Sequence, residues 1–201
     1  DHFEPWGDWE PKNFAEITPS ARVEKGFLPF DYGVFSLMAE TSFFEKKQIP
    51  LPQRLADLPQ NHYRKKLVLE DPRTSTPGLA FLLFTQEVLG DGADAFWKKL
   101  RDHWLAMLPG WDTAYGLFLK GEASLVWSYS SSQAYHRSEN QSQYRAVLFE
   151  EGNPIHIEGA ALLKGISPDT RRLAEQFFEF LLSPEVQTRV FTSQWMYSVI
   201  K

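Results

Sequence analysis

A short polar turn at residues 71–78 (DPRTSTPG) carries the residue types best suited to binding a small ligand. The apolar run 66–69 before it predicts a buried strand, and the apolar run 79–89 after it is long enough for a helix. Thr76 is a good helix N-cap, and Pro77 suits the first helical position because no N–H is needed there. The turn then presents backbone N–H groups, hydroxyls and a positive helix end, which can hold an anion or hydrogen-bond a small ligand. The alternative is that the turn only caps a helix and binds nothing.

Three further segments place aromatic side chains beside polar ones at the ends of predicted elements. They are residues 109–116 (PGWDTAYG), 128–136 (SYSSSQAYH) and 193–197 (SQWMY). Each ring taken alone is better explained by ordinary packing against a core. Together with the polar turn, however, they favour one binding site for a flat cationic or heteroaromatic ligand, because Trp and Tyr faces stack on such rings.

Composition narrows the class of protein. The chain has 201 residues, 43% hydrophobic and 23% charged, which indicates a globular fold. A net charge of -5 and the lack of a basic run argue against nucleic-acid binding. No apolar stretch is long enough to span a membrane. There is no cysteine, which excludes disulfides, thiolate metal sites and a cysteine nucleophile.

Catalysis has little support in the sequence. It contains no H-E-x-x-H, G-x-S-x-G, Walker A or G-x-G-x-x-G pattern, and its five His lack metal-ligand spacing. Ser75 as a nucleophile would need a positioned base. His103 and His136 are conceivable partners, although nothing in the sequence pairs either with it. We therefore expect no enzyme, no catalytic residue, no metal site and no cofactor.

Alternating strand and helix patterns predict an α/β fold. Residues 1–26 are expected to be irregular, with one short helix, and Pro29 suggests an edge or crossover position for the strand that contains it. The expected strands cover 27–38, 66–69, 124–130 and the pair 144–149 and 155–163. The expected helices cover 51–61, 79–89, 93–107, 111–121 and the start of 131–140, with two more beginning after the cap signals Ser167-Pro168 and Ser183-Pro184.

In this order and spacing the motifs resemble the periplasmic thiamine-binding proteins of bacterial ABC importers. The motifs are DPRTSTPG at 71–78, GWDTAYGLFLKG at 110–121, SYSSSQAYH at 128–136 and WMY at 195–197, with PFDYG at 29–33 similar to the family's first interlobe strand. The resemblance covers about 27–197. DPRTSTPG is shared loosely with binders of iron, polyamines and other ions, whereas the aromatic set is specific to thiamine.

The resemblance implies a type 2 periplasmic-binding fold, with a mixed sheet flanked by helices, present mainly as the second lobe plus hinge segments. Residues 1–38 would be a remnant of the first lobe and the first crossover strand. Residues 39–160 would form the second lobe, and 161–201 the return crossover and truncated C-terminal helices. The family's opening strand–helix–strand portion is missing, and Ser198 replaces the proline expected after WMY. We therefore expect a fragment of a longer protein, with weakened ligand binding.

Carried over by motif, a set of polar and aromatic residues would contact thiamine or its phosphates. The main contacts are Ser75, Trp111, Tyr129, Tyr135 and Trp195, with Thr74, Thr76 and Ser131 as secondary candidates. The implied function is capture of thiamine in the periplasm and its delivery to membrane permease subunits. Exposed lobe-facing apolar surface would also favour a dimer of the fragment.

Two alternatives remain open. One is a binding protein for another small ion or phosphate ester such as ferric iron, although Tyr129 and Tyr135 are too far apart for the adjacent tyrosines expected there. The other is an enzyme acting on thiamine compounds. The thiamine-degrading enzymes that share this fold use a cysteine nucleophile, which this chain lacks.

Overall fold

The computed structural model describes residues 2–23 and 26–201, which form two compact units. Unit 1 combines Asp1–Gly33 with Ile155–Lys201, and unit 2 is Val34–Pro154. Asp1, Glu24 and Lys25 lie outside the described residues, so the expectation for 1–26 is tested on the rest. There the segment holds a two-residue strand, β1 (Phe3–Glu4), and two 3-10 helices, η1 (Phe14–Glu16) and η2 (Pro19–Ala21). The assignment of these units to the lobes of a binding protein stays a prediction.

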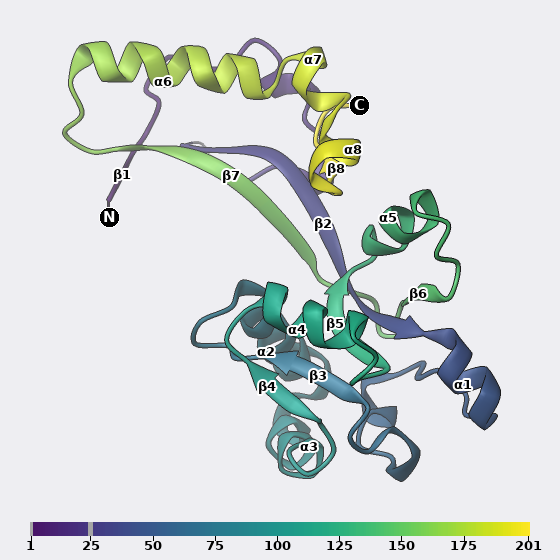
Figure 1. The fold of residues 1–201 in the computed structure, drawn as a ribbon. Helices are drawn as coiled ribbons and strands as arrows, with labels where there is room; N and C mark the ends of the chain where they lie inside the picture. The colour runs from purple at the N-terminus through teal and green to yellow at the C-terminus, as the bar shows by residue number, and fades with distance from the viewer. Residues whose placement is uncertain (1, 24–25) are drawn as a thin grey trace. The chain divides into compact units, whose positions relative to one another are not determined.

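Unit 2 is built on a mixed sheet (Figure 1). Its strands are the second half of β2 (Phe27–Glu40), β3 (Leu67–Glu70), β4 (Ala106–Leu108), β5 (Leu125–Tyr129) and β6 (Tyr144–Val147). Strand β3 runs parallel to β4 and β5, while β2 is antiparallel to both β5 and β6. This confirms the expected α/β class, because parallel neighbours require helical crossovers.

Both faces of the unit 2 sheet are covered, which explains why β3 reads as a continuous apolar run. Leu67 and Leu69 pack into one buried cluster with Trp127 of β5, and Val68 packs into a second cluster with Val126. The helices that cover the faces are α1 (Thr41–Lys47), α2 (Thr76–Leu89), α3 (Ala93–Leu100), α4 (Trp111–Leu119) and α5 (Ser132–Ser138). The 3-10 turns of this unit are η3 (Leu55–Asp57), η4 (Asn61–Tyr63) and η5 (Gly90–Gly92).

Unit 1 has its own hydrophobic cluster, in which Leu162 of a strand packs with Phe178 of a helix. Its strands are β1, the first half of β2, β7 (Ile155–Leu163) and β8 (Tyr197–Ser198). Helix α6 (Pro168–Leu181) lies along β7, followed by α7 (Pro184–Gln187) and α8 (Val190–Gln194) (Figure 1). The two predicted cap signals are confirmed: Ser167 accepts from Thr170 N–H and Ser183 from Val186 N–H.

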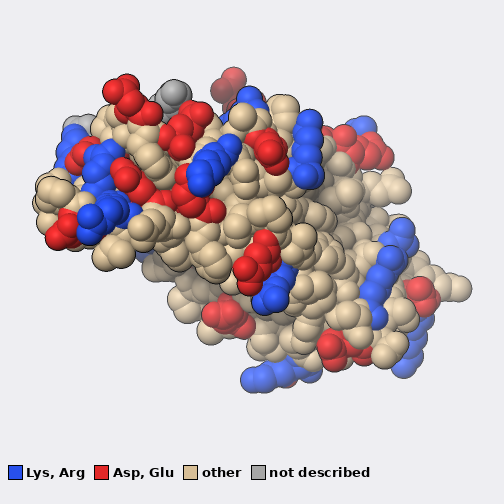
Figure 2. Space-filling model, turned by 90° about the horizontal axis from the view of Figure 1, so that it is seen from above, with Lys and Arg blue, Asp and Glu red and all other residues tan. Residues whose placement is uncertain are grey.

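The outer surface of unit 1 is mixed in character. Leu173, Phe177 and Phe180 of α6 are about half exposed or more. On the same helix Arg171 forms an ion pair with Glu175. Acidic and basic side chains are interspersed over the face of the molecule drawn in Figure 2. None of the described helices is both long enough and apolar enough to cross a membrane.

Three expectations about the elements are wrong in detail. The helix expected over 93–107 ends at Leu100, because Leu105 N–H is taken by Leu67 O and 106–108 pair with β3 as a strand. The helix expected over 51–61 is two short 3-10 turns, η3 and η4. The strands at 144–149 and 155–163 exist but do not pair with each other, since β6 and β7 each neighbour β2.

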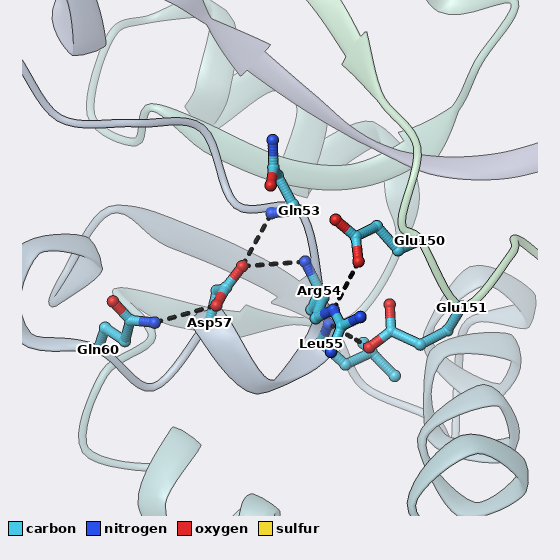
Figure 3. Close-up of polar contacts among 7 residues, drawn as sticks. All are labelled: Gln53, Arg54, Leu55, Asp57, Gln60, Glu150 and Glu151. Atoms are coloured by element: carbon cyan, nitrogen blue, oxygen red, sulfur yellow. Dashed lines mark hydrogen bonds and ion pairs between the residues drawn. The ribbon is translucent and has the colours of Figure 1, made fainter.

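Polar contacts hold the segment around η3 to the loop that follows β6 (Figure 3). Arg54 Nε contacts a Glu150 carboxylate oxygen at 2.6 Å, and Leu55 N–H donates to Glu151 at 3.2 Å. Asp57 accepts from the backbone N–H groups of Gln53 and Arg54, which closes the 3-10 turn on itself. Glu150 and Glu151 therefore tie the loop after β6 to the segment around η3.

Replacing Gly78 by alanine is expected to destabilise the protein by about 1–3 kcal/mol, because the chain is overpacked there. An added Cβ would lie 2.4 Å from Glu70 O, a backbone atom that cannot move aside. The matched control is Gly116→Ala in α4, where a Cβ meets nothing within 4 Å. That change should stabilise by about 0.5–1 kcal/mol. Urea denaturation measures both, and equal effects would contradict the close approach.

Candidate functional site

The turn after β3 is organised by its own side chains. The Asp71 carboxylate accepts from Arg73 N–H at 2.9 Å and contacts the Arg73 guanidinium at 2.6 Å. These hydrogen bonds lower the pKa of Asp71 to about 2. Thr74 Oγ1 donates to Pro109 O at 2.8 Å, which ties this turn to the one that precedes α4. The two turns therefore lie side by side at one edge of the sheet.

The helix cap at this turn is Ser75, and the expectation that Thr76 caps the helix is wrong. Ser75 Oγ accepts from Gly78 N–H at 3.5 Å, while Thr76 is the first helical residue and is exposed. Pro77 is therefore the second helical position. Because Ser75 is the N-cap, its buried hydroxyl lies at the positive end of a 14-residue helix. Ser75 is thus placed where an oxygen-rich ligand group would meet the helix end.

Trp111 begins α4 directly after Gly110 and is partly buried. Its Nε1–H donates to Ser128 Oγ at 2.9 Å, which fixes the plane of the indole. The ring stacks on Tyr115, one helical turn later, with centroids 4.8 Å apart and planes 24° apart. It also lies 6.4 Å from the Tyr129 ring at a tilt of 60°. Trp111 and Tyr129, predicted from separate motifs, are thus neighbours.

Tyr129 ends β5 and is stacked on Phe35 of β2 at 4.7 Å. Tyr135 lies two turns of chain further, on α5, and is 38% exposed. Ser131 lies between the two tyrosines in the sequence and is buried. Its Oγ has no hydrogen-bond partner among the residues that the structure describes. Unit 2 therefore carries seven of the eight predicted site residues at the ends of β3 and β5 and at the starts of α2, α4 and α5.

Trp195, the eighth predicted site residue, belongs to unit 1. It is the C-cap residue that follows α8, in the left-handed conformation with φ of 55°, and its ring lies 5.8 Å from that of Phe191. A non-glycine residue in this conformation is uncommon. Its place in the site stays a prediction from the resemblance.

His136 is a buried structural residue. Its Nε2 lies 2.7 Å from Tyr115 Oη and its Nδ1 lies 2.7 Å from Gln141 Oε1. Burial lowers the pKa of His136, so the ring is neutral at pH 7. Both nitrogens are engaged, so His136 is not a base for Ser75. Among the described residues there is also no group of three or more acidic or His side chains that could hold a metal ion.

The sequence reasoning missed Glu70, the last residue of β3. Its side chain is 2% exposed, and burial raises its pKa to about 8. Neither carboxyl oxygen has a hydrogen-bond partner among the described residues. The available signal was a glutamate closing an apolar strand immediately before the polar turn. It also missed Ser128 and Tyr115, which orient Trp111.

A family model described as "Bacterial extracellular solute-binding protein" matches residues 3–199. The chain belongs to this family. It is 40% identical over 188 residues to the thiamine-binding periplasmic protein of Salmonella typhimurium, and the match covers 93% of the chain and 56% of that relative. The Haemophilus influenzae protein of the same name is 35% identical over 204 residues, covering 98% and 59%. This chain therefore spans little more than half the length of these relatives.

Solved structures agree with this assignment. A periplasmic thiamin binding protein superposes with a TM-score of 0.88 at 37% identity, covering all of this chain and 60% of the other. Iron-bound HitA from Pseudomonas aeruginosa gives a TM-score of 0.80 at 20% identity, which establishes a shared fold alone. The type 2 periplasmic-binding fold expected from the sequence is confirmed.

Replacing Glu70 by glutamine is expected to stabilise the protein increasingly as pH rises. In the folded state the raised pKa keeps a proton that the unfolded chain releases above about pH 4.5, so native stability falls between there and pH 8. Glutamine removes this loss, and the gain at pH 9 over pH 6 should be on the order of 1–3 kcal/mol. Thermal melting at both pH values measures it. A constant difference would contradict a neutral buried Glu70.

Proposed function

We propose that this chain is the ligand-binding portion of a periplasmic binding protein that captures thiamine or a thiamine phosphate for an ABC importer. The observation that carries the proposal is the ring cluster of Trp111, Tyr115 and Tyr129 beside the Ser75-capped helix end, in a chain whose relatives are named thiamine-binding. The proposed partners are the permease subunits of the importer, and the proposed location is the periplasm. The proposed role is capture of the ligand without catalysis.

The ring cluster suits the chemistry of thiamine. Its thiazolium carries a positive charge, and its aminopyrimidine is a flat heteroaromatic ring. Indole and phenol faces attract both, by cation–π interaction and by stacking. Trp111 is held in plane by Ser128 and by its stack on Tyr115, so little rotamer freedom is lost when a ligand binds.

The hydroxyl-rich turn suits the other end of the ligand. Ser75 and the first N–H groups of α2 would meet the hydroxyethyl group or its phosphate, and Thr74, Thr76 and Ser131 are further candidates. Tyr135 is a further candidate in unit 2, and Trp195 of unit 1 is a candidate from the resemblance alone. Ferric iron is a weaker candidate, because its binders share the fold at only 20% identity in HitA and no cluster of metal ligands occurs among the described residues.

Thiamine is expected to quench the tryptophan fluorescence of the protein saturably, and Trp111→Ala should abolish most of that signal. The reason is direct stacking on the Trp111 indole. The matched control is Trp104→Phe, since Trp104 packs on Trp97 away from the turn and should leave the titration unchanged. Saturable quenching that survives Trp111→Ala would contradict the site, and loss of thiamine during incubation would favour an enzyme.

Ser75→Ala is expected to weaken thiamine monophosphate binding by about tenfold and thiamine binding far less, because a hydrogen bond to a charged group is the stronger one. The variant also loses its helix cap, at about 1 kcal/mol. Ser167→Ala, which removes the equivalent cap of α6, is the matched control for stability. Calorimetric titration gives both affinities. Equal losses for the two ligands would contradict a phosphate cradle at Ser75.

A further inference from the structure

A row of buried polar side chains crosses the unit 2 sheet at the edge that carries the candidate site. Ser36 of β2 is paired with Ser128 of β5 in the antiparallel ladder. Val68 of β3 is paired with Val126 of β5 in the parallel ladder. Glu70 and Ser128 each lie two residues further along their strands, so the same register places them side by side. Side chains two apart on a strand share a face, which places all three on one face. Each of the three is 2% exposed or less.

This row is not satisfied internally. Ser36 Oγ and both Glu70 carboxyl oxygens have no hydrogen-bond partner within the described part of the chain. Ser128 Oγ accepts from Trp111 and lies 3.2 Å from Ser132 Oγ. A buried polar atom without a partner costs about 1–3 kcal/mol, so each one calls for an explanation, and a bound ligand group is one of them.

The row borders the ring that is expected to stack on the ligand. Ser128 connects the two, because its Oγ accepts from the Trp111 indole at 2.9 Å and it lies two residues beyond Val126, as Glu70 lies two residues beyond the paired Val68. Glu70 also immediately precedes the turn that positions Ser75. A carboxyl group therefore lies at the junction of the two halves of the candidate site.

No basic side chain on the elements packed against β3, or free in the turn after it, is available to pair with the Glu70 carboxyl. The titratable groups of the turn are Asp71 and Arg73, which pair with each other. On the elements packed against β3 the others are Asp112 and Tyr115 of α4, Glu87 of α2 and Tyr129 of β5, and none of them is basic. Burial is the main cause of the raised pKa of Glu70, and no charged group contributes to it.

We propose that Glu70 is the negative partner of a cationic ligand held on Trp111. The O–H bond of the acid breaks when the cation arrives, the proton passes to solvent, and the carboxylate stays behind to face the positive ring. This inference rests on the proposed function, because it requires a ligand such as thiamine that carries a permanent positive charge. A cation in a poorly hydrated site supplies the electrostatic attraction that ionises a buried acid.

The sign of the expected pH dependence follows from the free and bound states. Above the free-state pKa of about 8, Glu70 is already ionised and thiamine binds with full affinity. Below it, binding must first remove the proton, so affinity falls as pH falls. Between pH 8.5 and 6.5, where the thiazolium is intact, thiamine should bind roughly twentyfold more weakly at the lower pH. His136 does not interfere, because burial lowers its pKa.

The test is calorimetric titration of thiamine into the full chain and into Glu70→Gln across this pH range. At pH 7 the parent should release close to one proton per thiamine, read from the dependence of the heat on the ionisation enthalpy of the buffer. Glu70→Gln should release none, bind more weakly at pH 8.5 and show a flat profile. Glu122→Gln, an exposed change of the same type in the same unit, should match the parent.

A second titrating acid must be separated from Glu70. Burial, together with the nearby Glu158, raises the pKa of Asp31 in unit 1 to about 7. A pH dependence that persists in Glu70→Gln would overturn the proposal. Thiamine binding that is equal in parent and Glu70→Gln at every pH would overturn it while leaving the proposed function intact. Absence of thiamine binding at every pH would overturn both.

Discussion

The parallel pairing of β3 with β5 is the constraint on which the candidate site depends. Because the two strands run the same way, their carboxyl ends and the turns that follow them meet at one edge of the sheet. That edge receives the Ser75-capped start of α2 and, through the Thr74 contact with Pro109, the start of α4. The ring of Trp111 then reaches β5 through Ser128. An antiparallel pairing would have separated these parts.

The same edge carries a local loss of stability. An apolar side chain at position 70 would continue the pattern of the preceding residues of β3 and would remove two buried oxygens that lack a partner among the described residues. The chain instead holds an acid there, in the same row as Ser128 of β5 and, one strand further, Ser36 of β2. Buried groups whose pKa is strongly shifted gather at functional sites more often than elsewhere. The buried acid and the rings of Trp111, Tyr115 and Tyr129 therefore lie in the same part of unit 2.

Much of this arrangement could be predicted from the sequence. The strand–turn–helix unit around 71–78 and the aromatic starts of α4 and α5 follow from local signals. The choice of Ser75 over Thr76 as the cap does not, because both are adjacent hydroxyls and the register of the first helical N–H group decides. The helix expected over 93–107 was shortened by β3, whose free edge takes residues 106–108 as a strand.

Glu70 lay beyond local signals for a different reason. A single glutamate at the end of an apolar run is usually a solvated strand end, and only the covering of the sheet on both faces makes it buried.

Gly78 gives the strand–turn–helix unit a consequence for recognising related chains. Since a Cβ at this position would lie within 3 Å of the backbone at Glu70 and Asp71, α2 can begin this close to the sheet only with glycine there. A chain that keeps the hydroxyls of the motif but carries a larger residue in place of this glycine must start its helix further out. The turn of such a chain would then have a different backbone conformation and would suit a different ligand. Glycine at this position therefore marks chains in which the helix starts as close to the sheet as it does here.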